Sequence, residues 1–292
     1  MLLSAALLTS ATSGCARRAS ESDSASRSST ASASASPATN TLPAGADEVG
    51  ARVSRSPRHG EYAMIRTGAG DSVRAWVVFP ERTSKAPVVV VVHEIFGLST
   101  WVRGVADQLA ADGFIAIAPD LLTGKVAPEA GSDTLTQAQA TGAIRSLRSE
   151  DVQRQIAAIG QYGMALPAAL PRYGVVGFCW GGTASFNSAV LSPAGQGAAV
   201  VYYGSSPVSA SLASVKIPVL GLYGGDDARV NATIPAADSA MRALGKSYRA
   251  QIFPGAGHGF LRQQAGQAGA NLTAARQAWP LTIAFFREHL GR

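Results

Sequence analysis

From about residue 58 onward, short apolar runs alternate with longer stretches in which apolar residues recur at helical spacing. The clearest run, Ala86–Val92, is nearly all valine and too short for a helix of its own, so it is typical of a strand buried on both faces. Comparable runs predict strands at 61–66, 73–79, 88–93, 114–118, 173–178, 198–203, 218–223 and 248–253. Helices are predicted at 100–112, 151–163, 183–191, 234–244 and 272–290.

The order of these elements predicts an α/β fold. The first two strands have no helix between them and are expected to form an antiparallel edge, whereas the later strands alternate with helices. Such alternation favours a mostly parallel central sheet of about eight strands with helices on both faces. In open sheets of this kind, ligands bind at the carboxyl ends of the strands.

The N-terminus differs in composition from the rest of the chain. Residues 1–15 form an apolar run that ends in small residues and Cys15, which predicts a bacterial lipoprotein signal with lipid on the Cys15 sulfur. No Lys or Arg precedes the run, and Thr12 stands where Leu is usual. A simple secretory signal cut nearby and a cytoplasmic protein with a spurious extension therefore stay open. The main expectation is export to the cell envelope or beyond.

Residues 16–57 are rich in Ser and Ala and have no hydrophobic period, so they are expected to be a flexible tether. Residues 58–292 are then expected to form the folded domain. The chain has 292 residues and is 47% hydrophobic, enough for one large domain. Its net charge of +6 comes from scattered arginines without a basic run, which argues against nucleic-acid binding.

The segment Gly177-Phe178-Cys179-Trp180-Gly181-Gly182 directly follows a predicted strand. It matches the nucleophile elbow G-x-S-x-G of α/β-hydrolases, with Cys in place of Ser. This elbow is a strained strand-to-helix turn that exposes its central side chain, and glycines are needed where a Cβ would collide. The positive end of the following helix is expected to favour the thiolate of Cys179. A plain glycine-rich turn around a buried Cys is the alternative.

An elbow enzyme also needs an acid and then a histidine, in that chain order. Gly224-Gly225-Asp226-Asp227 follows the strand predicted at 218–223, and either aspartate is placed to be the acid. Among the four histidines, only His258 follows the acid on a loop, between Gly257 and Gly259. Upstream, the loop that begins with His93-Glu94-Ile95 follows the valine strand. In elbow hydrolases such a loop supplies one oxyanion-hole N–H and the residue after the nucleophile supplies the other, which here are Ile95 and Trp180.

These four segments together resemble the dienelactone hydrolase family, from about Ser56 to Arg292. The resemblance implies an α/β-hydrolase fold with Cys179 as nucleophile, His258 as base and an aspartate as the orienting acid. The family pattern G-G-x-D-x-x-V places that acid at Asp227, with Asp226 as the fallback. It also implies that Glu94 holds the resting thiol and later accepts its proton. The alternative for Glu94 is a plain ion pair with Arg103 or Arg262.

The resemblance is incomplete where the substrate binds. Family members that act on dienelactone hold its carboxylate with two arginines, and Arg262 matches the one after the histidine. The stretch 133–139, where the second is expected, contains no arginine, and Arg145 and Arg148 are spaced differently from Cys179. The hydrolase chemistry is thus expected, but a different substrate from dienelactone.

Several side chains are compatible with either a structural or a site role. Asp120 follows the strand predicted at 114–118 and either lines the site or caps a turn. Four aromatic residues form either a pocket wall or ordinary core: Trp101, Trp180, Tyr202 and Phe260.

The overall expectation is a monomeric hydrolase that cleaves a small ester or lactone through an acyl-enzyme. No cofactor, metal or nucleic-acid partner is expected, and membrane contact only through the lipid on Cys15. Another activity of the same fold, such as a peptidase or acyltransferase, and a non-catalytic binding lipoprotein are the alternatives.

Overall fold

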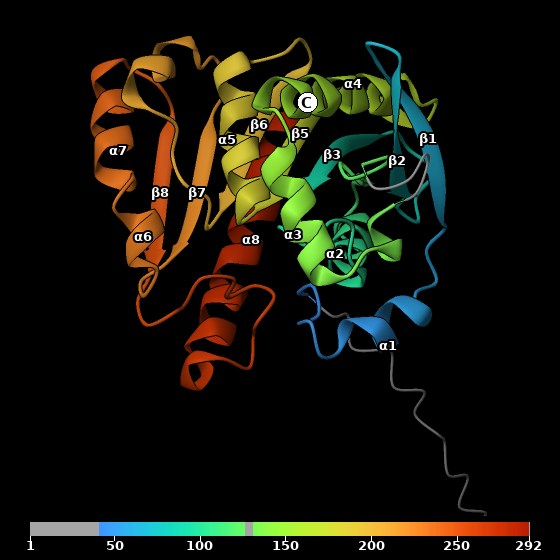
Figure 1. Ribbon diagram of the computed structural model, residues 1–292, viewed down its shortest axis with the longest axis horizontal. Coiled ribbons are helices and arrows are strands. Elements are labelled where there is room, and N and C mark those ends of the chain that lie inside the picture. Colours follow the sequence, from blue (N-terminus) through green and yellow to red (C-terminus); the bar gives the residue numbers. More distant parts are fainter. Residues whose placement is uncertain (1–40, 126–130, 292) are drawn as a thin grey trace, which may run out of the picture. The chain divides into compact units, whose positions relative to one another are not determined.

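An eight-stranded sheet forms the centre of the described part, residues 41–125 and 131–291 of a computed structural model (Figure 1). Its strand order is β1-β2-β4-β3-β5-β6-β7-β8. The strands are β1 (Gly60–Gly68), β2 (Asp71–Val78), β3 (Ala86–Val92), β4 (Ile115–Pro119), β5 (Ala169–Phe178), β6 (Gln196–Tyr202), β7 (Val219–Gly224) and β8 (Tyr248–Phe253). Strand β2 runs antiparallel to both β1 and β4, and the other neighbouring pairs are parallel. The predicted sheet with an antiparallel edge is therefore confirmed.

The valine strand β3 shows why the sheet is buried on both faces. All seven of its residues are buried. Val89 and Val91 belong to the hydrophobic core on one side of the sheet, and Val88, Val90 and Val92 to the core on the other side. Alternate side chains point to opposite faces of a strand, so a continuous apolar run is what a doubly covered strand requires.

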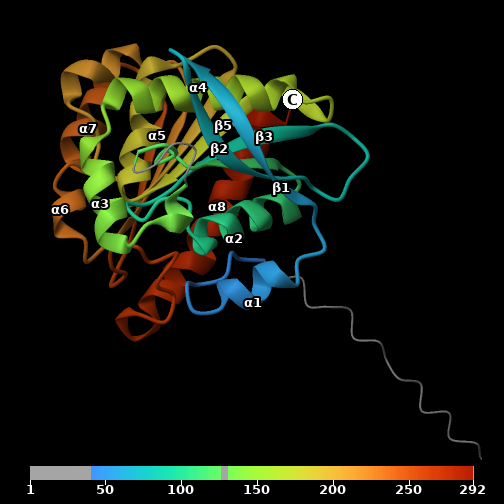
Figure 2. The ribbon, with the colours of Figure 1, turned by 45° about the vertical axis from the view of Figure 1, so that its right-hand side comes forward.

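Helices cover both faces of this sheet (Figure 2). One core contains residues of α2 (Thr100–Ala111) and α8 (Ala270–Leu290). The cores on the other face contain residues of α4 (Ser149–Ala165), α5 (Trp180–Leu191) and α7 (Ile234–Ala243). All five correspond to predicted helices.

Three α-helices of the described residues are not predicted, namely α1 (Val49–Ser54), α3 (Gln137–Ser146) and the short α6 (Ala228–Asn231). Helix α3 buries only Ala140 and Ile144, too few apolar positions for a helical period to stand out in the sequence. It begins at a capping box formed by Thr136 and Gln139.

The end of the predicted tether packs against the domain instead of extending freely. Residues 41–57 include helix α1 (Val49–Ser54), whose Val49 is buried against α2. A Cβ at Gly104 of α2 would overlap the Val49 side chain, so this glycine permits the close approach. Ser56 and Arg58 both hydrogen-bond Asp107 of α2, which fixes the far end of the segment. A few anchoring residues thus suffice to order a segment that has no hydrophobic period.

The rest of the tether, residues 16–40, and the predicted signal with Cys15 lie outside the described residues. Within the ranges that are described, no helix combines the length and the apolar character needed to cross a membrane.

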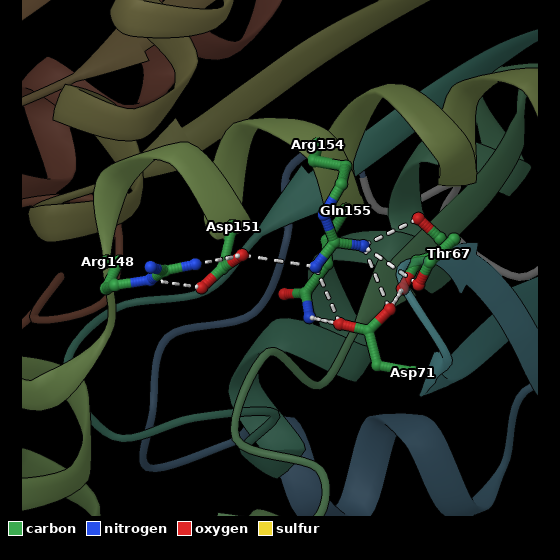
Figure 3. A network of polar contacts seen from close by, with 7 residues as sticks. Thr67, Asp71, Arg148, Asp151, Arg154 and Gln155 are labelled. Atoms are coloured by element: carbon green, nitrogen blue, oxygen red, sulfur yellow. Dashed lines mark hydrogen bonds and ion pairs between the residues drawn. The ribbon is translucent and has the colours of Figure 1, made fainter.

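A cluster of polar side chains ties the turn between β1 and β2 to helix α4 (Figure 3). Asp71 receives hydrogen bonds from Arg154 at 2.7 Å and 2.9 Å, and also from Thr67 and Gln155. The Arg154 guanidinium holds the pKa of the Asp71 carboxyl well below its usual range, because the charged form is the one that is bonded.

We expect Asp71→Asn to lower the free energy of unfolding at pH 7 by about 1 kcal/mol, a small value because solvent screens this partly exposed pair. The folded-state pKa is depressed, so the stabilisation is present above the unfolded pKa of about 4 and is lost as pH falls below it. Urea unfolding at several pH values measures this. Asp238→Asn, which breaks an exposed pair within α7, is the control with little expected effect. A loss that persists undiminished at pH 3 would contradict the linkage.

Candidate active site

Cys179 occupies a strained turn between β5 and α5. Its backbone angles are φ 56° and ψ −117°, a conformation that side-chain-bearing residues rarely adopt. The flanking glycines are required by space, because a Cβ at Gly177 would overlap the Gly181 carbonyl and one at Gly181 would overlap the carbonyl oxygens of Val92 and His93. The turn that the sequence predicts is therefore present, and it is packed directly against the end of β3.

The environment of the thiol differs from the expectation of a favoured thiolate. Burial, and to a lesser extent the nearby charge of Glu94, raise the pKa of Cys179 to about 11. The Trp180 backbone N–H at the start of α5 and the guanidinium of Arg229 act in the opposite direction but do not compensate. The helix end favours the thiolate as expected, yet burial outweighs it, so the resting side chain is a thiol. A base is needed to ionise it.

His258 and Asp227 meet at the carboxyl ends of the last two strands. The Nδ1 of His258 lies 2.5 Å from Oδ2 of Asp227, whose side chain is 7% exposed. Because Nδ1–H donates to this carboxylate, Nε2 is left free to take a proton. Asp227 also caps α6 by accepting a hydrogen bond from the Val230 N–H. The neighbouring Asp226 is exposed, so of the two candidate acids it is Asp227 that contacts the imidazole.

A cavity of about 250 Å³ opens beside the Cys179 side chain. It is lined by Ile95, Cys179, Trp180, Thr183, Tyr203, Ser205 and Arg229. Both predicted oxyanion-hole residues, Ile95 and Trp180, thus border the same space as the thiol. Trp180 is the first residue of α5, where a backbone N–H has no acceptor within the helix. A cavity of this volume has room for a small molecule.

Glu94 is buried beside this cavity and pairs with Arg262. The Arg262 Nε lies 2.6 Å from Glu94 Oε2, and the Glu94 side chain is only 4% exposed. Burial raises the pKa of Glu94 to about 7, while Arg262 pulls it down. Arg103, the other predicted partner, instead bonds Thr100 and lies over the Trp76 ring. Glu94 is therefore able to gain or lose a proton near neutral pH.

A family model matches most of the sequence. Residues 73–290 match the model described as "Dienelactone hydrolase family", which is most of the chain. The chain belongs to the dienelactone hydrolase family. Its predicted α/β-hydrolase fold is confirmed by the similarity to solved dienelactone hydrolase structures.

Relatives with assigned names agree with this membership. A "Putative carboxymethylenebutenolidase" of Salmonella typhimurium is 28% identical over 87% of this chain and 99% of its own length. A Bradyrhizobium protein named "Probable 2-oxo-3-(5-oxofuran-2-ylidene)propanoate lactonase" is 30% identical over 76% of this chain and 91% of its own. This dienelactone hydrolase family member is accordingly a carboxylic ester hydrolase.

Two solved structures illustrate the shared fold. A dienelactone hydrolase-like promiscuous phosphotriesterase from metagenomic libraries has a TM-score of 0.68 at 22% identity, covering 80% of this chain and 99% of that one. A dienelactone hydrolase from Anabaena variabilis has a TM-score of 0.60 at 22% identity, with the same coverage. At these identities the likeness concerns the fold alone.

The arginines of this dienelactone hydrolase family member lie differently from the sequence expectation. Arg262 does not line the cavity but faces Glu94 and the Phe96 ring. Arg148 bonds Asp151 on the exposed surface, and Arg145 borders a separate groove beside α3. The guanidinium in the cavity wall is that of Arg229, which sequence reasoning missed although it lies only two residues after Asp227.

A second missed residue is Tyr203. Tyr202, one of the four pocket candidates from the sequence, is instead in the core, where its hydroxyl lies 2.7 Å from the Thr282 hydroxyl. Tyr203 lines the cavity, stacks edge-on against His258 at 5.2 Å between ring centroids, and has a positive φ of 40°. Its buried hydroxyl has no hydrogen-bond partner among the described residues. Two tyrosines in succession at a strand end were the only sequence signal. Of the other pocket candidates, Trp101 and Phe260 are in the core.

Proposed function

We propose that the chain cleaves a small ester or lactone through an acyl-enzyme on Cys179, with His258 and Asp227 as base and orienting acid. The observation that carries the proposal is the strained Cys179 at the wall of a small cavity that Ile95 and Trp180 also border. Names of relatives, which include a butenolidase and a lactonase, support the same class of substrate.

The proposed chemistry has two halves. In acylation, the Cys179 proton passes to Glu94 and from it to His258, and the sulfur attacks the carbonyl carbon, so a C–S bond forms as the ester C–O bond breaks. The alkoxide leaves with that same proton, donated by the His258 imidazolium, and Glu94 is again a carboxylate. In deacylation, His258 takes a proton from water, the hydroxide attacks the thioester, and the acid and the thiol are released. The Ile95 and Trp180 N–H groups stabilise the oxyanion in both halves.

Trapping of the covalent intermediate tests this proposal. The protein is mixed briefly with p-nitrophenyl butyrate, quenched in acid and digested, and the peptide masses are measured by mass spectrometry. We expect a butyryl group on the peptide that contains Cys179 and none on a peptide that contains Cys15. His258→Ala, which slows deacylation, should raise the trapped fraction or abolish turnover. Full turnover by protein whose Cys179 is already carboxamidomethylated would contradict the proposal. Absence of any turnover in the wild type would also contradict it and would favour a non-catalytic binding protein.

Glu94 is proposed as the base that first receives the thiol proton. Because the pKa of the Cys179 thiol is raised, ionisation of the thiol needs a nearby base. Glu94 is mainly ionised, and so able to accept this proton, above its own pKa of about 7. We expect Glu94→Gln to slow acylation about 10²-fold while deacylation changes little. In the wild type the acylation rate should rise as pH increases through about 7, and in Glu94→Gln this rise should be absent. Stopped-flow measurement of the p-nitrophenol burst separates the two steps.

Glu150→Gln, at an exposed position in α4, is the matched control for loss of one carboxylate and should leave the burst unchanged. If Glu94→Gln slows both steps equally, or leaves the burst intact, Glu94 is only the partner of Arg262.

Export is proposed separately. The run that ends at Cys15 supports a lipoprotein signal, with lipid attached to the Cys15 sulfur. Labelling of expressing cells with an alkyne-bearing palmitate should mark the wild type and not Cys15→Ala. Labelling that survives this substitution, or an unprocessed soluble protein, would contradict it.

A further inference from the structure

The loop from His93 to Ser99, which carries Glu94 and Ile95, is held at its beginning by the segment after β4. His93 is fully buried. Its Nδ1 lies 2.7 Å from the Glu94 carbonyl oxygen, and its Nε2 accepts a hydrogen bond from the Leu121 N–H at 3.2 Å. One neutral tautomer satisfies both contacts, with the proton on Nδ1. The Trp180 ring stacks on this imidazole at 5.6 Å, so His93 touches both oxyanion-hole segments.

The same loop is held at its other end by a chain of hydrogen bonds. The Leu98 N–H donates to Ser132 Oγ at 2.7 Å, and Ser132 Oγ donates to Asp120 Oδ2 at 2.9 Å. The Ser132 N–H donates to the same oxygen at 2.6 Å. Asp120 is fully buried, and its second oxygen accepts from the Leu122 N–H. A buried charged acceptor strengthens such a chain, and its loss leaves several donors unsatisfied.

Packing adds a steric limit to these bonds. Gly97 has a positive φ of 72°, and a Cβ on it would overlap Ser132. Ser132 therefore fills the space that a side chain at position 97 would need. Ile95 in turn packs with Leu122 and Trp180 in a small apolar cluster. These contacts at both ends of the loop, together with the packing of Ile95, fix the position of the Ile95 backbone.

We propose that Ser132 and Asp120 are positioning residues that place the Ile95 N–H for oxyanion stabilisation, acting through the Leu98 N–H and the backbone between them. This inference rests on the proposed acyl-enzyme function. It assigns a role to two side chains that touch neither the cavity nor the thiol. The expected effect is large because loss of one oxyanion donor costs about 10²–10³ in kcat.

Ser132→Ala removes the acceptor for Leu98 and the donor to Asp120. We expect kcat for p-nitrophenyl butyrate to fall about 10- to 100-fold with KM within about threefold of wild type, since a small displacement of a catalytic group has this scale of effect. Inhibition by a trifluoromethyl ketone, which forms a tetrahedral adduct on the thiol, should weaken in proportion. Alkylation of Cys179 by iodoacetamide forms no oxyanion and should keep its rate.

Thr134→Ala is the matched control, because the Thr134 hydroxyl hydrogen-bonds the Gly131 carbonyl in the same turn and not the 93–99 loop. It should leave kcat and the ketone affinity unchanged. Asp120→Asn keeps an acceptor oxygen and is expected to lie between wild type and Ser132→Ala, and it carries the test if Ser132→Ala does not fold.

The inference is overturned if Ser132→Ala only lowers the unfolding midpoint, if its loss is in KM, if Thr134→Ala loses as much, or if alkylation slows in parallel. Failure of the acyl-enzyme proposal is distinguishable, because it would appear in the wild type as turnover that survives carboxamidomethylation of Cys179.

Discussion

Alanine in place of Cys179 is expected to reduce kcat/KM for p-nitrophenyl esters by about 10⁴- to 10⁶-fold, the scale on which hydrolases lose activity with their nucleophile. The reason is structural as well as chemical. Cys179 alone occupies the strained turn beside Ile95 and Trp180; Thr183 and Ser205 also line the cavity, but neither hydroxyl is in that turn. Initial rates on purified protein, corrected for enzyme-free hydrolysis, measure the change.

The matched control is Cys15→Ala, which removes the chain's other cysteine and should leave soluble-substrate turnover unchanged. The unfolding midpoint of Cys179→Ala should stay near that of the wild type, because Cys179 is only partly buried and alanine keeps its β-carbon. Activity within tenfold of wild type in Cys179→Ala would remove the basis for an acyl-enzyme on this residue.

Asparagine in place of Asp227 is expected to lower kcat by about 10⁴-fold, as for other triads whose acid is converted to its amide. The 2.5 Å contact between Asp227 and His258 Nδ1 fixes the tautomer that leaves Nε2 free. An amide can donate to Nδ1 and so favours the wrong tautomer. The fall should be in kcat, with KM little changed, because Asp227 does not line the cavity.

Asp226→Asn provides an unusually close control, since it makes the same chemical change one residue away at an exposed position. We expect wild-type kinetics from it. A large loss in Asp226→Asn together with a small one in Asp227→Asn would reverse the assignment of the acid.

The sequence was sufficient wherever structure is specified locally. The valine run of β3 and the glycines around Cys179 impose burial and turn geometry on their own neighbours, so the strands and the elbow were predictable. Residues 41–57 were not, because their anchors, such as Val49 and Ser56, are single residues in a Ser/Ala-rich segment. Their partners on α2 are distant in sequence.

Properties that depend on a balance of distant groups were also out of reach. The helix end behind Cys179 was visible in the sequence, but the burial and the Glu94 charge that overcome it depend on the packed structure. The exchange of Tyr202 for Tyr203 has a simpler cause. Strand β6 ends at Tyr202, and the positive φ of Tyr203 begins a turn that no residue pattern located. Both rings belong to the same core, but only Tyr203 also lines the cavity.

The segment 41–57 is hydrogen-bonded to the loop that follows His258. The Ala46 N–H donates to the Arg262 carbonyl at 2.9 Å, and the Gln264 amide donates to the Pro43 carbonyl at 2.8 Å. A shortened protein that begins at residue 58, the boundary that composition suggests, would thus lose both hydrogen bonds to the loop that follows His258. Expression of a shortened protein should start upstream of Leu42, because without these two hydrogen bonds the loop that follows His258 loses contacts even while the sheet folds.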